Sequence, residues 1–138
     1  MDEITVKVII EASVENVWKL WVDPKDIIQW NNASDDWHTT NADNDLREGG
    51  SFNFRMEAKD GSMGFDFGGV YEKVITNGQI DYIIGDGRKV KILFYSTGNK
   101  TEVIETFEAE STQSIELQKS GWQAILNNFK KYAELNKP

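Results

Sequence analysis

The side chain with the clearest chemical potential in this sequence is Glu105, an acidic residue inside an apolar alternation. Val103, Glu105 and Phe107 are two residues apart, so in an extended strand all three point to one face. A carboxyl group on a buried apolar face is costly unless it becomes neutral or finds a cation. Glu105 could then anchor a hydroxyl-bearing apolar ligand or transfer a proton. The alternative is a strand end at which Glu105 reaches solvent or pairs with Arg88 or Lys91.

Other residue types that often carry chemistry are sparse. The single histidine, His38, follows Asp35, Asp36 and Trp37. An imidazole can act as a general base or metal ligand, but a metal site needs further ligands at suitable spacing. The sequence has no Gly-x-Ser-x-Gly nucleophile elbow, and residues 61–64 lack the lysine and helix of a phosphate loop. We therefore predict no catalytic residue, no metal ligand and no cofactor.

A second charged group lies just before a pair of glycines. Asp45, Arg47 and Glu48 precede Gly49 and Gly50. One interpretation is a charged mouth in which Arg47 orients a ligand. The other, which we favour, is a structural turn in which Arg47 pairs with a neighbouring carboxylate and the glycines permit positive φ.

The element expected to position these groups is a long amphipathic helix over residues 113–135. Its apolar residues recur at steps of three, four and seven, the period of a single helical face. Such a helix is about 35 Å long and can lie across a small sheet. Its apolar face comprises Ile115, Trp122, Ile125, Leu126, Phe129 and Ala133.

The chain before that helix predicts two short helices and an antiparallel meander. Residues 5–10 alternate as a first strand, after which Ser13 and Pro24 are typical of the starts of two short helices. A further strand is expected over residues 37–40, and Gly68 and Gly69 suggest a bulge or sharp bend. Turn signals then separate strands whose inward faces comprise Phe52, Phe54, Met56, Phe65, Phe67, Tyr71, Ile80, Tyr82, Ile84, Val90, Ile92, Phe94, Val103 and Phe107.

This inward face is strongly aromatic, which leaves two possibilities. Large rings are hard to pack at crystal-like density, and buried tyrosines need partners for their hydroxyl groups. The face either forms an ordinary aromatic core or lines a small-molecule cavity under the long helix. In the second case Tyr71, Tyr82 and Trp122 offer polar groups on an apolar wall.

Composition limits the classes of function. The chain has 138 residues, a net charge of −8 and no cysteine. We expect one domain, residues 1–138, in the reducing cytoplasm. The acidic start does not resemble a signal peptide, and no apolar run is long enough to insert into a membrane. The net negative charge also makes nucleic acid an unsuitable partner.

The order and spacing of several segments resemble the START-like, helix-grip superfamily, which includes polyketide cyclases. Within it, the chain resembles stand-alone bacterial-type members of the family named after the activator of the 90-kDa heat-shock protein's ATPase. The resemblance implies an α+β fold: β-α-α, then a curved antiparallel sheet of about six to seven strands around one long C-terminal helix. It also implies an apolar cavity between sheet and helix. The resemblance is carried by residues 17–21, 30–31, 44–52, 69–71, 106–107 and 121–129.

Three functions follow as hypotheses. The first is a non-catalytic carrier or sensor of a hydrophobic small molecule, such as a lipid, polyketide or flavonoid. The second is a cyclase, aromatase or hydrolase that uses acid–base groups of the cavity. The third is a co-chaperone-like protein with a chaperone partner, although these residues contain no counterpart of the eukaryotic co-chaperone's additional N-terminal domain. The expected ligand-binding residues are Trp30, Phe54, Met56, Phe65, Phe67, Tyr71, Tyr82, Phe94, Glu105, Trp122, Ile125, Leu126 and Phe129.

Overall fold

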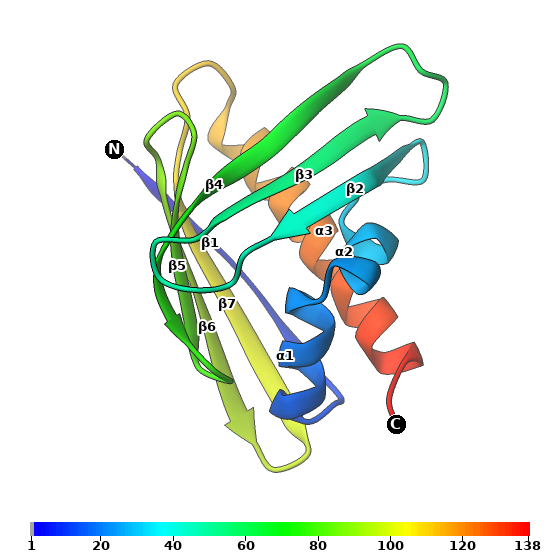
Figure 1. Ribbon diagram of the computed structural model, residues 1–138, viewed down its shortest axis with the longest axis vertical. Coiled ribbons are helices and arrows are strands. Elements are labelled where there is room, and N and C mark those ends of the chain that lie inside the picture. The colour runs from blue at the N-terminus through cyan, green and yellow to red at the C-terminus, as the bar shows by residue number, and fades with distance from the viewer. Residues whose placement is uncertain (1) are drawn as a thin grey trace.

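A computed structural model describes residues 2–138 and confirms the predicted α+β helix-grip architecture (Figure 1). The chain forms a strand, two short helices, six further strands and a long final helix. In chain order these are β1 (Glu3–Ile10), α1 (Val14–Val22), α2 (Pro24–Trp30), β2 (Trp37–Asn44), β3 (Ser51–Ala58), β4 (Gly64–Ile75), β5 (Gln79–Ile84), β6 (Lys89–Thr97), β7 (Lys100–Glu108) and α3 (Ile115–Leu135).

The strands form one antiparallel sheet in the order β1-β7-β6-β5-β4-β3-β2. Every neighbouring pair from β2 to β7 is consecutive in the chain, as expected for a meander, and β1 joins the free edge of β7. The sheet curls around one side of α3, while α2 lies between β2 and α3 (Figure 1). The long helix is therefore enclosed by strands on one side and by the short helices near its C-terminal half.

The predicted hairpin turns are present, and their backbone conformations explain the residues found there. Asn77 has φ of 63° and Gly87 has φ of 93°, both in the left-handed region that tight turns require. The turns that join β4 to β5 and β5 to β6 thus carry the asparagine and glycine that tolerate this conformation.

Of the bulge or sharp bend expected at Gly68 and Gly69, the structure has no bulge. Both glycines keep regular pairing with β3, and the register of β4 against β5 shifts between Tyr71 and Lys73 instead. Gly69 has another role, because a Cβ atom there would lie 2.3 Å from the carbonyl oxygen of Ile83. Glycine at this position permits the close approach of two backbones.

The start of α3 differs slightly from the expected one. The helix begins at Ile115. Ser114 is its N-cap, and the Ser114 hydroxyl accepts a hydrogen bond from the Leu117 amide at 3.1 Å. Ile115 is 40% exposed, so its predicted place on the buried face is wrong. Gln118 is buried in this turn instead. Its side-chain oxygen accepts a hydrogen bond from the backbone amide of Glu110 at 2.8 Å, which satisfies the buried polar group. The first turn of α3 therefore secures the preceding loop.

Side chains of α3 also bind the outer edge of β1. The Lys130 ammonium donates to the carbonyl oxygen of Ile9 at 2.7 Å, and the Gln123 amide donates to that of Lys7 at 3.1 Å. These bonds fix the long helix to the edge of the sheet opposite β2.

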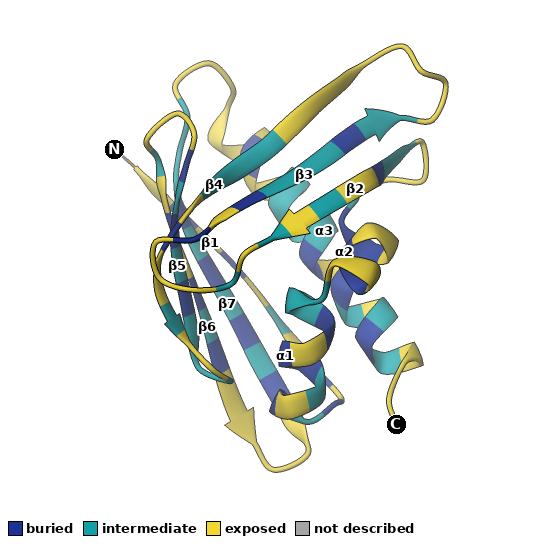
Figure 2. Cartoon of the chain, viewed as in Figure 1, coloured by how far each residue is buried: buried dark blue, intermediate teal, exposed yellow. Residues whose placement is uncertain are grey.

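Around the C-terminal half of α3, buried residues pack into a solid core (Figure 2). The Phe129 ring lies 4.8 Å, centroid to centroid, from those of both Trp21 and Trp30. Phe94 extends this cluster through edge contacts with Trp18 and Trp21. Within residues 2–138, no helix is both long and apolar enough to cross a membrane.

Candidate ligand-binding site

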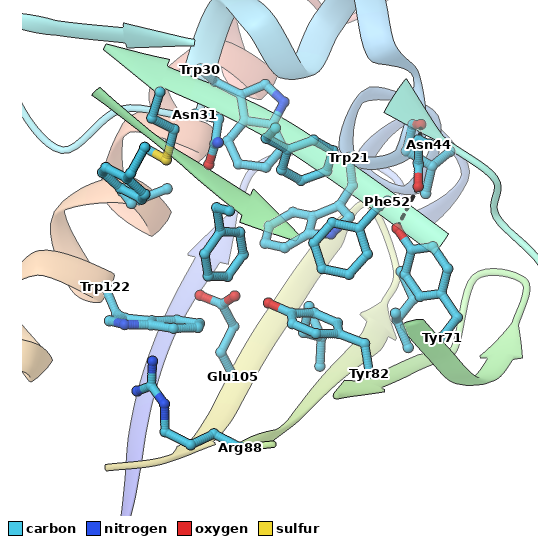
Figure 3. Close-up of a pocket in the computed structure, with 18 residues that line it drawn as sticks. Trp21, Trp30, Asn31, Asn44, Phe52, Tyr71, Tyr82, Arg88, Glu105 and Trp122 are labelled. Carbon is cyan, nitrogen blue, oxygen red and sulfur yellow. Dashed lines mark hydrogen bonds between the residues drawn. The ribbon is translucent and has the colours of Figure 1, made fainter. Parts of the chain in front are cut away.

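A cavity of about 280 Å³ lies between the sheet and the N-terminal half of α3 (Figure 3). This volume is close to the lower end of the range typical of small-molecule sites. Most of its wall is apolar and aromatic. The lining residues are Trp21, Val22, Trp30, Asn31, Asn44, Phe52, Phe54, Met56, Phe65, Phe67, Tyr71, Ile80, Tyr82, Arg88, Ile92, Glu105, Trp122 and Ile125.

The helical wall is built around Trp122. Its ring stacks on Phe107 of β7 with a centroid distance of 4.0 Å and an interplanar angle of 12°. The Phe67 ring of β4 is nearly perpendicular to it, at an interplanar angle of 77° and a centroid distance of 6.1 Å. Trp122 and Ile125 stay only partly buried, unlike Leu126 one residue later, because they face the cavity rather than the core.

The structure brings together ten of the thirteen residues predicted as ligand-binding. They are Trp30, Phe54, Met56, Phe65, Phe67, Tyr71, Tyr82, Glu105, Trp122 and Ile125. The other three, Phe94, Leu126 and Phe129, lie in the solid core and do not line the cavity. Contact of any of these residues with a ligand stays a prediction.

Eight lining residues were absent from the predicted site. Phe52, Ile80 and Ile92 belong to the inward faces of the strands, which periodicity marked as buried. Trp21 lies at helical spacing from Val14, Val17 and Trp18 of α1, which also indicates a buried position. Asn31 and Asn44 stand at the ends of α2 and β2, where no periodic signal exists. The complete set is Trp21, Val22, Asn31, Asn44, Phe52, Ile80, Arg88 and Ile92.

Glu105 points into the cavity from β7 (Figure 3) and is only 6% exposed. Within residues 2–138 its carboxyl group forms no hydrogen bond or ion pair. Arg88 pairs instead with Asp86, at 2.9 Å, and Lys91 is exposed. The alternative of a solvated or ion-paired Glu105 is therefore wrong. Burial without a partner raises the pKa of Glu105 to about 8, so the carboxyl group is mostly neutral at pH 7.

Two tyrosines add hydroxyl groups to the cavity wall. Tyr71 donates a hydrogen bond to the side-chain oxygen of Asn44, and the side-chain Nδ2 of Asn44 donates to the carbonyl oxygen of Val22 at 2.8 Å. Tyr82 is 7% exposed, and its hydroxyl has no hydrogen-bond partner in the described part of the chain. Burial, followed by the nearby Glu105 carboxyl, raises the pKa of Tyr82 well above its usual value. Both phenols stay protonated at neutral pH.

Arg88 is the only cationic residue among those that line the cavity. Its guanidinium group is held at one end of the sheet, where it also donates to the Glu108 carbonyl oxygen at 3.4 Å. The lining residues that can carry charge are thus Glu105, Tyr71, Tyr82 and Arg88. The arrangement suits an apolar molecule with a few oxygen atoms, since most of the wall offers only van der Waals contact.

The other charged groups considered in the sequence lie outside the cavity. Arg47 pairs with Asp45 through its Nε atom at 3.0 Å, which supports the structural-turn interpretation. His38 lies on β2 opposite Glu57. Across residues 2–138, no group of three or more histidine, aspartate or glutamate side chains is placed to hold a metal ion.

A curled seven-stranded antiparallel sheet, folded around one long helix and enclosing an apolar cavity, defines a START-like, helix-grip domain of a ligand-binding class. The sequence profile of the Activator of Hsp90 ATPase homolog 1-like protein family matches residues 11–134. The chain belongs to this family.

Solved structures agree with this assignment. An AHSA1-like protein from Aeromonas hydrophila is 45% identical with a TM-score of 0.92, over 97% of this chain and 93% of that one. The protein Chr148 from Cytophaga hutchinsonii is 56% identical with a TM-score of 0.84, and the match covers 97% of this chain and 93% of that one. CV1439 from Chromobacterium violaceum shares the fold at 19% identity, with a TM-score of 0.85 over 96% of each chain. No curated protein sequence matches the chain.

Proposed function

We propose that this protein binds a hydrophobic small molecule, such as a lipid, polyketide or flavonoid-like compound, and acts as its carrier or sensor without chemical turnover. The observation that carries this proposal is the cavity of about 280 Å³ with a mostly apolar wall beside a buried hydrophobic core. Burial of a ligand against this wall contributes about 25 cal/mol per Å² of apolar area, before the costs of association.

The shape of α3 supports the proposal. The same helix packs densely at Phe129, which is fully buried, and leaves space at Trp122 and Ile125. A chain that needed only a core would gain stability from a larger side chain at Ile125, because unfilled apolar volume forfeits dispersion contacts. The space is therefore consistent with selection for binding.

A fluorescence titration with flavonoids, fatty acids and sterols tests the proposal. We expect saturable quenching of tryptophan emission by at least one class. Ile125→Trp fills the cavity and should abolish binding while the protein stays folded, and Trp122→Ala should weaken binding at least tenfold. Tyr95→Ala is the matched control, because Tyr95 is exposed and lies outside the cavity. Binding that both cavity variants leave unchanged would locate the ligand elsewhere and refute the proposal.

A second candidate function is an acid–base enzyme of the cyclase, aromatase or hydrolase kind. Glu105 favours it, since a buried carboxyl group in an apolar cavity with a pKa of about 8 exchanges its proton near neutral pH. A suitable probe is the exchange of the acidic C–H protons of 2-tetralone in deuterated buffer, followed by NMR. Acceleration over buffer that Glu105→Gln removes would support catalysis. An unaccelerated rate for bound 2-tetralone would exclude Glu105 as a base for carbon acids.

A further inference from the structure

Two unpartnered polar groups face the same apolar cavity from different strands. Glu105 lies on β7 and Tyr82 on β5, with β6 between them, and both side chains are more than nine-tenths buried. Both point inward, and Figure 3 shows the Tyr82 hydroxyl and the Glu105 carboxyl directed toward one part of the cavity. The Glu105 carboxyl also contributes to the raised pKa of Tyr82, which is consistent with this placement.

Such a pair needs an explanation, because a buried hydroxyl and a buried carboxyl without partners are each costly. The other tyrosine of the cavity shows the contrast, since Tyr71 already donates to Asn44. In the described part of this chain no group is hydrogen-bonded to the Tyr82 hydroxyl or the Glu105 carboxyl, so a partner has to enter the cavity. A bound molecule with an oxygen atom at this position would meet that need.

We propose that Tyr82 and Glu105 form a two-donor site for a single ligand oxygen, so that the cavity prefers planar apolar molecules that carry a conjugated carbonyl group. This inference rests on the proposed function and adds the chemical class of the ligand. It concerns recognition and requires no reaction.

The protonation states agree with this geometry. Burial raises the pKa of Glu105 to about 8, so at neutral pH the group carries the proton that a carbonyl oxygen accepts. The Tyr82 hydroxyl is protonated as well. A tyrosine and a neutral carboxylic acid in an apolar site are an effective donor pair for a ketone oxygen. The rings of Phe52 and Trp122 also line the cavity and offer aromatic contact to a conjugated ligand.

A matched pair of probes tests the inference: 9-fluorenone and fluorene, which share a planar ring system and differ by one carbonyl oxygen. We expect the wild-type protein to bind fluorenone about tenfold tighter than fluorene at pH 6, which corresponds to the net gain from one or two neutral hydrogen bonds. Tyr82→Phe and Glu105→Leu should each reduce this preference severalfold. Tyr95→Phe is the control, because this tyrosine is exposed and outside the cavity.

The carbonyl stretching frequency of bound fluorenone reports the hydrogen bonds directly. It should lie below its value in hydrocarbon solvent and move back toward that value in Tyr82→Phe and Glu105→Leu. A variant that only loosens the fold would not produce this change. Circular dichroism of each variant checks that it is folded.

The pH dependence separates the two donors. Ionisation of Glu105 above pH 8 removes its proton, so the preference of the wild type for fluorenone should decline between pH 7 and 9. Glu105→Gln keeps an N–H donor and should retain the preference over that range. Tyr71 and Tyr82 stay neutral over that range, because burial raises the pKa of both hydroxyl groups, and Arg88 is the other charged residue that lines the cavity.

The outcomes are distinguishable. Equal affinity for the two probes, with the carbonyl frequency of hydrocarbon solvent, would overturn the two-donor site and leave the proposed function intact. Failure of both probes to bind would overturn the proposed function for planar apolar molecules, and the two-donor site with it.

Discussion

Replacement of Glu105 by glutamine should change how the stability of the protein depends on pH. The folded protein holds this carboxyl group at a pKa of about 8, above the ordinary value of 4.5, because the group is buried in the apolar cavity. Between these two values the folded state keeps a proton that the unfolded chain releases. The wild-type free energy of unfolding therefore falls as pH rises through this window.

The magnitude follows from the size of the shift. Each pH unit within the window costs about 1.4 kcal/mol, and the whole interval amounts to about 5 kcal/mol. That is a large fraction of the stability of a typical domain. Water that enters the cavity would reduce the value, so about 3 to 5 kcal/mol is the expected range. Below pH 4.5 the contribution disappears, because both states are protonated.

The assay is urea denaturation of the wild type and Glu105→Gln, followed by circular dichroism at pH 5, 6, 7 and 8. All other titrating groups are common to the two proteins, so the difference between the two curves isolates Glu105. We expect the variant to gain stability relative to the wild type by about 1 kcal/mol per pH unit. Parallel curves over this range would show that Glu105 titrates normally and would refute the assigned burial and neutrality.

Three further predictions concern packing and backbone geometry, and all are measured by urea denaturation. Phe129→Ala should cost about 3 to 5 kcal/mol, because it empties the centre of the aromatic core; a loss below 1 kcal/mol would contradict that packing. Gly121→Ala should stabilise α3 by up to about 1 kcal/mol, since nothing lies within 4 Å of the added Cβ, whereas a net loss would mean that the glycine has another role. Gly69→Ala should destabilise strongly through contact with the Ile83 carbonyl oxygen, whereas Gly85→Ala, with its nearest atom 3.9 Å away, should be nearly neutral. Equal effects at these two glycines would disprove the steric argument.

The order of elements could be predicted because each depends on local signals. Two-residue alternation identified the inward faces of the strands, and left-handed turn residues such as Asn77 marked where they reverse. The stripe of α3 identified its sheet-facing side, apart from Ile115, whose place at the first turn lies beyond the edge of the buried face. Local patterns do not predict burial reliably at the ends of helices and strands, because tertiary contacts determine which of those residues are covered.

The division between core and cavity could not be predicted. Trp122 and Phe129 are seven residues apart on the same helical stripe, yet one borders a cavity and the other is fully buried. The difference arises because α1 and α2 bring Trp21 and Trp30 onto Phe129, while no element fills the space beside Trp122. Periodicity records which way a side chain points and contains no information about the volume in front of it.

For Glu105, too, the sequence predicts the direction of the side chain but not what surrounds it. Its inward direction follows from its alternation with neighbouring apolar residues, and its raised pKa follows from burial. Its lack of a partner depends on Arg88, which Asp86 holds in the turn between β5 and β6. A pairing between two residues of one turn competes with a pairing across the sheet, and the sequence alone does not show which one forms.

The hydrogen bonds from α3 to β1 also bear on how the protein avoids aggregation. An edge strand with free carbonyl groups is a template on which a strand of another molecule can assemble. Lys130 and Gln123 occupy the outward carbonyl oxygens of Ile9 and Lys7. An incoming strand would have to displace both side chains and the helix that carries them. The helix that bounds the cavity thus also closes one edge of the sheet to intermolecular pairing.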